Sequence, residues 1–399
     1  MAQYNRMNVL QIIRMEGPIN KAEIAKRANL SIPTVMKITD EILEKKVVHV
    51  VGKGESNGGK RPELLSITDS IYYIVGIDIG RSRTSVLIMD LKGTVISRRT
   101  MKTGRTNPAE KLMERVLELT ENVVLDGGIS RENLLGIGVV TPGLIDLEEG
   151  RVLYSPDFGW ENVDILSPVK EKFKLPVLLD NSNKAIAMGE KWFGIARDSS
   201  YFVCVNIGHG IGSAIMENGE LYRGNSGSSG EIGHITLEPN GSLCECGNKG
   251  CLEALASGKA IAREGRRAVQ EGASALILEK AGYDLDAIDA KEVFAAAEEG
   301  DVAARQIIKK AETYIGIGLA SYINLLDPDM LVLAGGLTNA GREFIDQIKK
   351  VAKERQMKFA GRKVKIRVAE LGEQAAAIGA ASMILKRFIE NGDEILKMR

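Results

Sequence analysis

Apolar residues near the start of the chain recur at helical spacing. The first apolar face ends at Gly17-Pro18 and contains Val9, Leu10, Ile12 and Ile13. A second, shorter helix is expected from Lys21 to about Ala28, because Asn20 and Glu23 have the spacing of a capping box. The pattern therefore predicts two consecutive helices at this end of the chain.

A turn at residues 29–31 separates these helices from a third one. Ser31 can cap this helix, and its inward-facing residues, at spacings of three and four, are Val35, Ile38 and Ile42. The outer face near its N-terminal end then carries Pro33, Thr34 and Lys37. In a helix-turn-helix, Ser31 and these three positions meet base edges and phosphates. The alternative interpretation is a small helical module that binds another protein.

After Lys46 the pattern changes to alternation. The runs VVHVV and ELLSI flank a glycine-rich loop and predict a β-hairpin with a long tip. Lys53, Lys60 and Arg61 lie in this tip, where glycines allow close approach to a phosphate backbone or a minor groove. We therefore expect residues 1–70 to form a winged helix-turn-helix DNA-binding domain.

From Tyr72 onward, two similar series of β-rich runs follow one another. One begins YYIVGIDIG and the other YFVCVNIGHG, and each continues as alternating helices and strands. Duplicated βββαβαβα units are the plan of the α/β actin-like (ribonuclease H-like) fold of sugar kinases and heat-shock ATPases. The predicted lobes are residues 71–195 and 196–399.

Glycines close the turns at the strand ends of both halves. Bare backbone N–H groups there can approach phosphate oxygens, and an aspartate at a strand end can hold a hydrated Mg²⁺. The candidate phosphate-loop residues are Asp78, Gly80, Gly208, Gly210, Gly335 and Gly336. Ordinary turn glycines look the same, so each short motif is weak alone.

One histidine and three cysteines are concentrated in the second half, between Glu231 and Glu253. They are His234, Cys244, Cys246 and Cys251. Three thiolates and an imidazole match the tetrahedral preference of Zn²⁺. Four protein ligands fill the coordination sphere of the ion, so we expect a structural ion rather than a catalytic one. We expect the ion to pin the loop that carries Glu231, His234 and Glu253. A disulfide or plain reduced thiols are the alternatives.

The charge is unevenly distributed along the chain. The formal net charge is zero, but residues 1–66 contain eleven Lys/Arg and seven Asp/Glu, which leaves 42 and 46 for the remainder. A mildly basic head is compatible with a nucleic-acid contact. Hydrophobic residues make up 44% of the chain, yet Arg6 and Arg14 interrupt the first apolar stretch. We expect no signal peptide and no membrane span, hence a cytoplasmic protein in which thiols favour metal over disulfides.

Six motifs in fixed order resemble the ROK family of repressors and sugar kinases. They are PGLID at 142–146, PDFGW at 156–160, NSNKAIAMGEKWFG at 181–194, GHGIGSAI at 208–215, GEIGH at 230–234 and CECGNKGCLE at 244–253. With the helix-turn-helix in front, the chain is most similar to the NagC/XylR/Mlc-like regulators of that family. The resemblance implies a cleft between two lobes in which sugar hydroxyls contact Asn181, Glu231, His234 and Glu253, and it places the family's zinc ligands on the same histidine and cysteines.

The chain departs from the family's kinases where phosphate is transferred. Ser182 occupies the position of the kinases' catalytic aspartate, and a serine hydroxyl is no base near neutral pH. Asp180 lies two residues away and is a weak substitute. Arg81 stands in the first phosphate loop and His209 in the second, where kinases carry small or hydroxyl residues. These changes predict vestigial phosphate loops and no catalytic residues, with neutral drift in a working kinase as the alternative.

The sequence thus predicts a sugar-responsive transcriptional repressor of carbohydrate-utilisation genes rather than an enzyme. Its expected partners are a palindromic double-stranded operator, a sugar effector and a second copy of the chain, with a tetramer as a further possibility. Sugar binding is expected to draw the lobes together and so change the spacing of the two DNA-binding heads. The two rival hypotheses are an ATP-dependent, glucokinase-like sugar kinase and a regulator controlled by a protein partner.

Overall fold

The computed structural model describes residues 2–55, 61–69, 71–104, 108–358 and 363–391. These residues form two compact units. Unit 1 contains residues 1–185 and the chain from residue 376 onward, and unit 2 contains residues 186–375.

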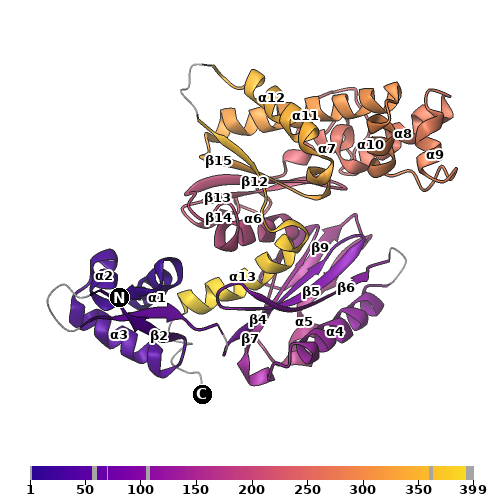
Figure 1. Cartoon of the computed structure of the whole chain (residues 1–399). Coiled ribbons are helices and arrows are strands. Elements are labelled where there is room, and N and C mark those ends of the chain that lie inside the picture. Colours follow the sequence, from indigo (N-terminus) through magenta and orange to yellow (C-terminus); the bar gives the residue numbers. More distant parts are fainter. Residues whose placement is uncertain (1, 56–60, 70, 105–107, 359–362, 392–399) are drawn as a thin grey trace. The chain divides into compact units, whose positions relative to one another are not determined.

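The head of unit 1 begins with three helices, as the apolar spacing predicts. They are α1 (Ala2–Glu16), α2 (Lys21–Ala28) and α3 (Ile32–Glu44) (Figure 1). The Asn20 side chain accepts a hydrogen bond from the Glu23 N–H, and Ser31 accepts one from the Thr34 N–H. Asn29 ends α2 in the left-handed conformation, with a φ of 53°. The predicted helix-turn-helix is therefore confirmed, including both caps.

A small antiparallel sheet completes the head. Its strands are β1 (Ile19–Asn20), β2 (Val48–Lys53) and β3 (Glu63–Ile67), in the order β1-β3-β2. The two strands of the predicted hairpin are present, but residues 56–60 of its tip lie outside the described residues. The core of the head contains Val9, Leu10, Ile13, Ile24, Val35, Ile38, Ile42 and Leu65, all buried. Ile12, predicted to be on the same face, is only half-buried.

The main sheet of unit 1 has five strands in the order β11-β7-β4-β5-β6. Its strands β4, β5 and β6 are antiparallel, whereas β7 and β11 run parallel to β4. Its strands and the helices over it are β4 (Tyr73–Ile79), β5 (Arg83–Asp90), β6 (Val95–Lys102), α4 (Ala109–Asp126), β7 (Leu134–Thr141), α5 (Leu166–Phe173) and β11 (Val177–Asn181), with η1 (Arg131–Asn133) before β7. A smaller sheet contains β8 (Leu144–Asp146), β9 (Arg151–Ser155) and β10 (Trp160–Asp164). Helix α6 (Ser182–Phe193) leads into unit 2.

Unit 2 repeats this sheet. Its order is β14-β13-β12-β15-β16, with β12, β13 and β14 antiparallel and β15 and β16 parallel to β12. The strands are β12 (Tyr201–Ile207), β13 (Ile211–Glu217), β14 (Glu220–Tyr222), β15 (Met330–Ala334) and β16 (Lys365–Val368). The two orders match when β4 is set against β12, so the predicted duplication and the α/β actin-like fold are confirmed.

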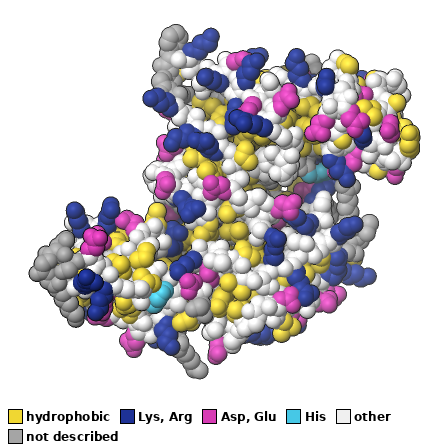
Figure 2. Space-filling model, in the orientation of Figure 1, with side chains coloured by type: hydrophobic (Ala, Val, Ile, Leu, Met, Phe, Trp, Pro, Cys, Tyr) yellow, Lys and Arg dark blue, Asp and Glu magenta, His cyan; other side chains and the backbone are white. Residues whose placement is uncertain are grey.

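Helices pack on one face of the sheet of unit 2 and bury its apolar core. They are α7 (Leu252–Ala256), α8 (Gly258–Gln270), α9 (Ala275–Lys280), α10 (Ala290–Glu298), α11 (Val302–Leu326) and α12 (Arg342–Arg355), with short helices η2 (Ile232–His234), η3 (Gly336–Asn339) and η4 (Gly372–Gln374). The core joins Val203 and Val205 of β12 to Ile315 and Leu319 of α11. In the described ranges, no helix has both the length and the hydropathy of a membrane span. Figure 2 shows acidic and basic side chains intermixed on one face, as zero net charge suggests.

The last helix, α13 (Ala375–Glu390), packs on the sheet of unit 1. Successive residues of a strand point to opposite faces, so Ile137 and Val139 pack under α4 and α5 while Gly138 faces α13. A Cβ at Gly138 would lie 1.9 Å from the Ala380 carbonyl oxygen. Helix α13 therefore belongs to unit 1. The predicted lobes, residues 71–195 and 196–399, follow chain order and place α13 in the second lobe. Small residues on β7 and α13, far apart in sequence, bring the end of the chain back to unit 1.

Replacing Gly138 with alanine is expected to destabilise the protein by about 3 kcal/mol, because α13 must shift to admit the methyl group. Thermal and urea unfolding measure the change. Gly52→Ala is the matched control, since a Cβ there meets nothing within 4 Å, and its effect should stay within about 0.5 kcal/mol. Equal stability of the two variants would contradict the close packing of α13 on β7.

Candidate functional site

His234, Cys244, Cys246 and Cys251 converge in unit 2. Their ligand atoms all lie within 4.8 Å of one another. Cys246 Sγ is 3.7 Å from Cys251 Sγ, and Cys244 Sγ is 3.5 Å from His234 Nδ1. Tetrahedral zinc with its usual bond lengths separates two sulfurs by about 3.8 Å and a sulfur from a nitrogen by about 3.5 Å. The donor set and both measured spacings therefore fit Zn²⁺.

The acid–base chemistry of the thiols also fits a cation. Burial and the neighbouring thiols raise the pKa of Cys251 to about 12, and burial raises the pKa of Cys244. Burial opposes ionisation of Cys246 as well, but hydrogen bonds from Asn248 and the other two thiols lower its pKa. Two of the three thiols thus resist ionisation alone, and a divalent cation would supply the charge that stabilises three adjacent thiolates.

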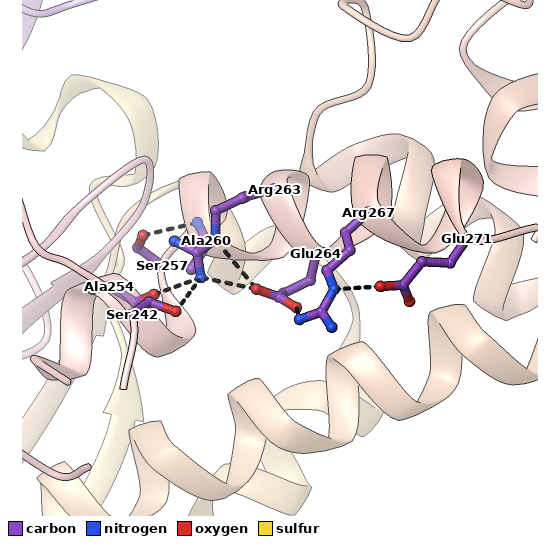
Figure 3. Close-up of polar contacts among 8 residues, drawn as sticks. All are labelled: Ser242, Ala254, Ser257, Ala260, Arg263, Glu264, Arg267 and Glu271. Atoms are coloured by element: carbon purple, nitrogen blue, oxygen red, sulfur yellow. Dashed lines mark hydrogen bonds and ion pairs between the residues drawn. The ribbon is translucent and has the colours of Figure 1, made fainter. Parts of the chain in front are cut away.

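The loop that carries these ligands is held at its base by the backbone. The Leu237 N–H donates to the Gly250 carbonyl and the Leu252 N–H to the Ile235 carbonyl, at 2.8 and 2.9 Å. Figure 3 shows a further anchor, in which Arg263 of α8 donates to Ser242 Oγ at 3.2 Å and to the Ala254 carbonyl at 2.9 Å. Arg263 ties the loop to α7 and α8, and no local sequence pattern marks it, because it lies outside the motif it supports.

Glu231, His234 and Glu253, the predicted sugar contacts of unit 2, are grouped beside the metal cluster. His234 turns Nδ1 toward Cys244, while its Nε2 lies 3.9 Å from Glu231 Oε2. Glu253 Oε2 accepts a hydrogen bond from the Ile211 N–H at 2.8 Å. The imidazole therefore faces the cysteines with one nitrogen and a carboxylate with the other, so an ion bound by Nδ1 would fix the ring's orientation.

Gly210 allows the Glu253 carboxylate to sit against the backbone. A Cβ at residue 210 would lie 2.5 Å from Glu253 Oε2. The carbonyl of Gly208 accepts the Gly258 N–H at 2.8 Å and so caps α8. Gly208 and Gly210, proposed from the sequence as phosphate-loop residues, thus position Glu253 and α8. This role was not evident from the sequence.

Asn181, the fourth predicted sugar contact, lies in unit 1 at the end of β11. Its Nδ2 donates to the Gly143 carbonyl at 2.9 Å, and its Oδ1 accepts the Asn183 N–H at 2.8 Å. Ser182 follows at the start of α6, with its Oγ 3.5 Å from Asp78 Oδ1. Asp180 is buried, and its Oδ1 accepts the Asn181 N–H. Asp180 therefore helps to fix the backbone at Asn181.

The first candidate phosphate loop contains an ion pair that the sequence did not predict. Arg81 Nη1 lies 2.7 Å from Asp157 Oδ1 of the PDFGW motif, and both side chains are largely buried. The Gly80 N–H donates to the Arg83 carbonyl at 3.1 Å. Arg81 therefore fills the loop with a paired guanidinium, where a nucleotide phosphate needs bare backbone donors.

The carboxyl group of Asp78 makes the stability of the protein depend on pH. Burial raises the pKa of its carboxyl group to about 7, although the Arg83 charge and the Ser182 hydroxyl act in the opposite direction. An unfolded aspartate titrates near 3.8. Between these values the folded protein holds a proton that the unfolded chain has released, so stability falls as the pH rises through this window.

The variant Asp78→Asn is expected to remove this penalty. Its free energy of unfolding should exceed that of the native chain by a larger margin at pH 8 than at pH 5, because only the native carboxyl must ionise. Urea unfolding at both pH values measures the margin, and the comparison between variant and native chain cancels other titrating groups. A margin that is constant with pH would contradict burial as the cause.

The remaining candidates behave as follows. Gly335 has a φ of 92°, a value that favours glycine, and Gly336 begins η3. In the head, Ser31, Pro33, Lys37 and Arg61 are exposed and Thr34 is half-buried, while Lys60 lies outside the described residues.

A cavity of about 250 Å³ between α8 and α11 is lined by Arg263, Arg267 and Lys310 among others, and by none of the predicted sugar contacts.

Comparison with known proteins extends these observations. A model of the ROK family matches residues 74–387. A xylose repressor from Caldicellulosiruptor bescii is 33% identical over 385 residues, which are 96% of this chain and 96% of the relative. The crystal structure of a ROK family transcriptional regulator, described as a homolog of the E. coli MLC protein, covers 99% of both chains with a TM-score of 0.84 and 26% identity.

A kinase matches a smaller part of the chain. The ROK family glucokinase from Streptomyces griseus, in complex with glucose and AMPPNP, has a TM-score of 0.70 and 28% identity, and it covers 78% of this chain and 98% of its own. The family model begins after the head, whereas the regulator aligns with nearly the whole chain, head included.

Proposed function

Because this chain belongs to the ROK family, we propose that it is a sugar-responsive DNA-binding repressor of carbohydrate-utilisation genes. The observation that carries the proposal is the match to a xylose repressor and a transcriptional regulator over nearly the full length, whereas the glucokinase covers only 78% of this chain. Such a protein binds DNA and a sugar and needs no catalytic residue. A repressor acts on the chromosome, so it works in the cytoplasm.

The sugar site that we propose uses Glu231, His234 and Glu253 of unit 2, and Asn181 of unit 1 is a further proposed contact. Carboxylates accept pairs of hydroxyl hydrogen bonds, and an imidazole held by a metal on one nitrogen addresses the ligand from its other side. The group beside the metal cluster supports this assignment. Zn²⁺ bound by His234 and the three cysteines would hold the loop in place and take no part in chemistry.

The DNA site that we propose is the outer face of α3 with Ser31, Pro33, Thr34 and Lys37, and Lys60 and Arg61 of the hairpin act as a wing. A helix-turn-helix dimer spans two half-sites about one turn of DNA apart, which implies a homodimer on a palindromic operator. A sugar that binds the DNA-free conformation better than the DNA-bound one weakens operator binding, and by linkage DNA weakens sugar binding equally.

Binding of the full-length protein to its own upstream DNA tests this function. Fluorescence anisotropy at fixed, moderate salt should show an affinity at least about 1,000-fold above that for random duplex. Equal affinity for both DNAs would reject the repressor and favour the kinase hypothesis.

No phosphoryl transfer from ATP to any sugar of a panel of hexoses and pentoses is expected. Ser182 lacks a basic group, and the Arg81–Asp157 ion pair fills the first phosphate loop. Because the Arg81–Asp157 ion pair remains, Ser182→Asp alone should leave ADP release at background. Sugar-dependent ADP release by the native chain, or its appearance in Ser182→Asp, would contradict the vestigial loops.

A further inference from the structure

Two large apolar side chains are exposed on the helix that we propose to enter the major groove. The exposed fraction of Ile32 is 51% and that of Met36 is 46%. They are four residues apart and so share one face of α3. The core face of the same helix is formed by other residues, Val35, Ile38 and Ile42. Packing of the head therefore does not account for Ile32 and Met36.

Three polar side chains of α3, those of Thr34, Asp40 and Glu41, are bonded within the head. Thr34 Oγ1 lies 2.7 Å from Ser31 Oγ, and Asp40 Oδ1 accepts from Lys21 Nζ at 2.7 Å. Glu41 accepts from Arg6 at 2.8 Å. Arg, Lys, Asn and Gln are the residue types that read guanine and adenine through bidentate hydrogen bonds, and of these α3 contains Lys37 alone. Apart from Lys37, direct readout by α3 therefore depends largely on its apolar face.

We propose that Ile32 and Met36 recognise the 5-methyl groups of thymines in each operator half-site. Among the four bases of DNA, only thymine presents a methyl group in the major groove, and apolar side chains are its usual partners. Both residues lie in the first two turns of α3, the part of a recognition helix that contacts base edges. Exposed Pro33 and Lys37 flank them, adding apolar surface and a cation for the phosphates.

This inference rests on the proposed function and deepens it, because it names the class of DNA sequence. The half-site should carry A·T pairs where the N-terminal half of α3 meets the groove. An apolar helix face can also bind another protein. The placement at the start of the second helix of a helix-turn-helix, beside exposed Lys37, favours DNA.

Single replacement of thymine by deoxyuridine tests the proposal, because it removes only the methyl group. The duplex is selected from a random pool by the full-length protein. Its affinity should fall about four-fold for each contacted methyl group removed, at one or two positions per half-site. Met36→Ala or Ile32→Ala should bind the thymine duplex about four-fold more weakly and should no longer distinguish deoxyuridine at the matching position.

Met15→Ala is the matched control, since Met15 is 56% exposed on α1, and it should keep full sensitivity to deoxyuridine. A protein that prefers one sequence but ignores every deoxyuridine replacement would overturn the inference and leave the repressor function intact. Loss of self-association or of protein binding in Met36→Ala, without loss of methyl sensitivity, would likewise overturn it. Selection that yields no preferred sequence would reject both.

Discussion

The variant Cys246→Ser is expected to lose both zinc and sugar binding while its DNA-binding head stays folded. Cys246 lies 3.7 Å from Cys251 in the four-residue cluster, and a serine hydroxyl is a poor ligand for Zn²⁺. Without the ion, Glu231 and His234 lose the constraint that fixes them for hydroxyl contacts. Bound zinc should fall from about one ion per chain to background, and the Kd for the sugar should rise at least ~100-fold.

Elemental analysis and calorimetric titration measure these two losses, and operator binding without sugar should remain at the native level. The matched control is Cys204→Ala, which removes the buried thiol of β12 and leaves the cluster whole. This control should keep its zinc and its sugar affinity. Native sugar affinity in zinc-free Cys246→Ser would contradict the structural role of the ion.

The variant Glu253→Gln is expected to bind the operator but to ignore the sugar. The carboxylate of Glu253 accepts the Ile211 N–H at 2.8 Å, and a glutamine that keeps this bond turns its NH₂ group, a donor, toward the ligand. Loss of a hydrogen bond to a charged group costs roughly 1.5–3 kcal/mol, so the sugar Kd should rise about 10- to 100-fold. In cells, the variant would repress whether or not sugar is present.

Glu245→Gln is the control for Glu253→Gln. Glu245 lies on the metal loop, is exposed and forms an ion pair with Lys259, and it is no predicted sugar contact. Its sugar response should equal that of the native chain. An equal loss of sugar response in both variants would show that removing any charge near the loop weakens sugar binding. Glu253 would then no longer be assigned to the sugar site.

The sequence predicted best what depends on local spacing. The caps at Asn20 and Ser31 and the bounds of α2 follow from hydrogen bonds within four residues, and the structure has them as expected. The His/Cys cluster could be predicted equally well, because four potential metal ligands lie within eighteen residues and are therefore close together in any fold of this loop. The repeat of β-rich runs predicted that the two units share one plan, and the matching sheets of the two units confirm it.

Contacts between distant segments could not be predicted in the same way. Gly138 and Ala380 meet because both are small, and neither has a pattern that points to the other. The Arg81–Asp157 ion pair joins two motifs that are 76 residues apart in the sequence. Strand β1, with two residues, is too short to show a period. The core face of α3 was predicted from the sequence, but only the structure shows how far Ile32 and Met36 are exposed.

The most direct test of the account is the operator affinity of the full-length protein with each member of a sugar panel, by fluorescence anisotropy at constant salt. We expect that one sugar or a few close analogues weaken operator binding at least about ten-fold, and that Glu253→Gln abolishes this effect. A sugar that binds tightly, by calorimetry, yet leaves the operator Kd unchanged would contradict a sugar-responsive repressor.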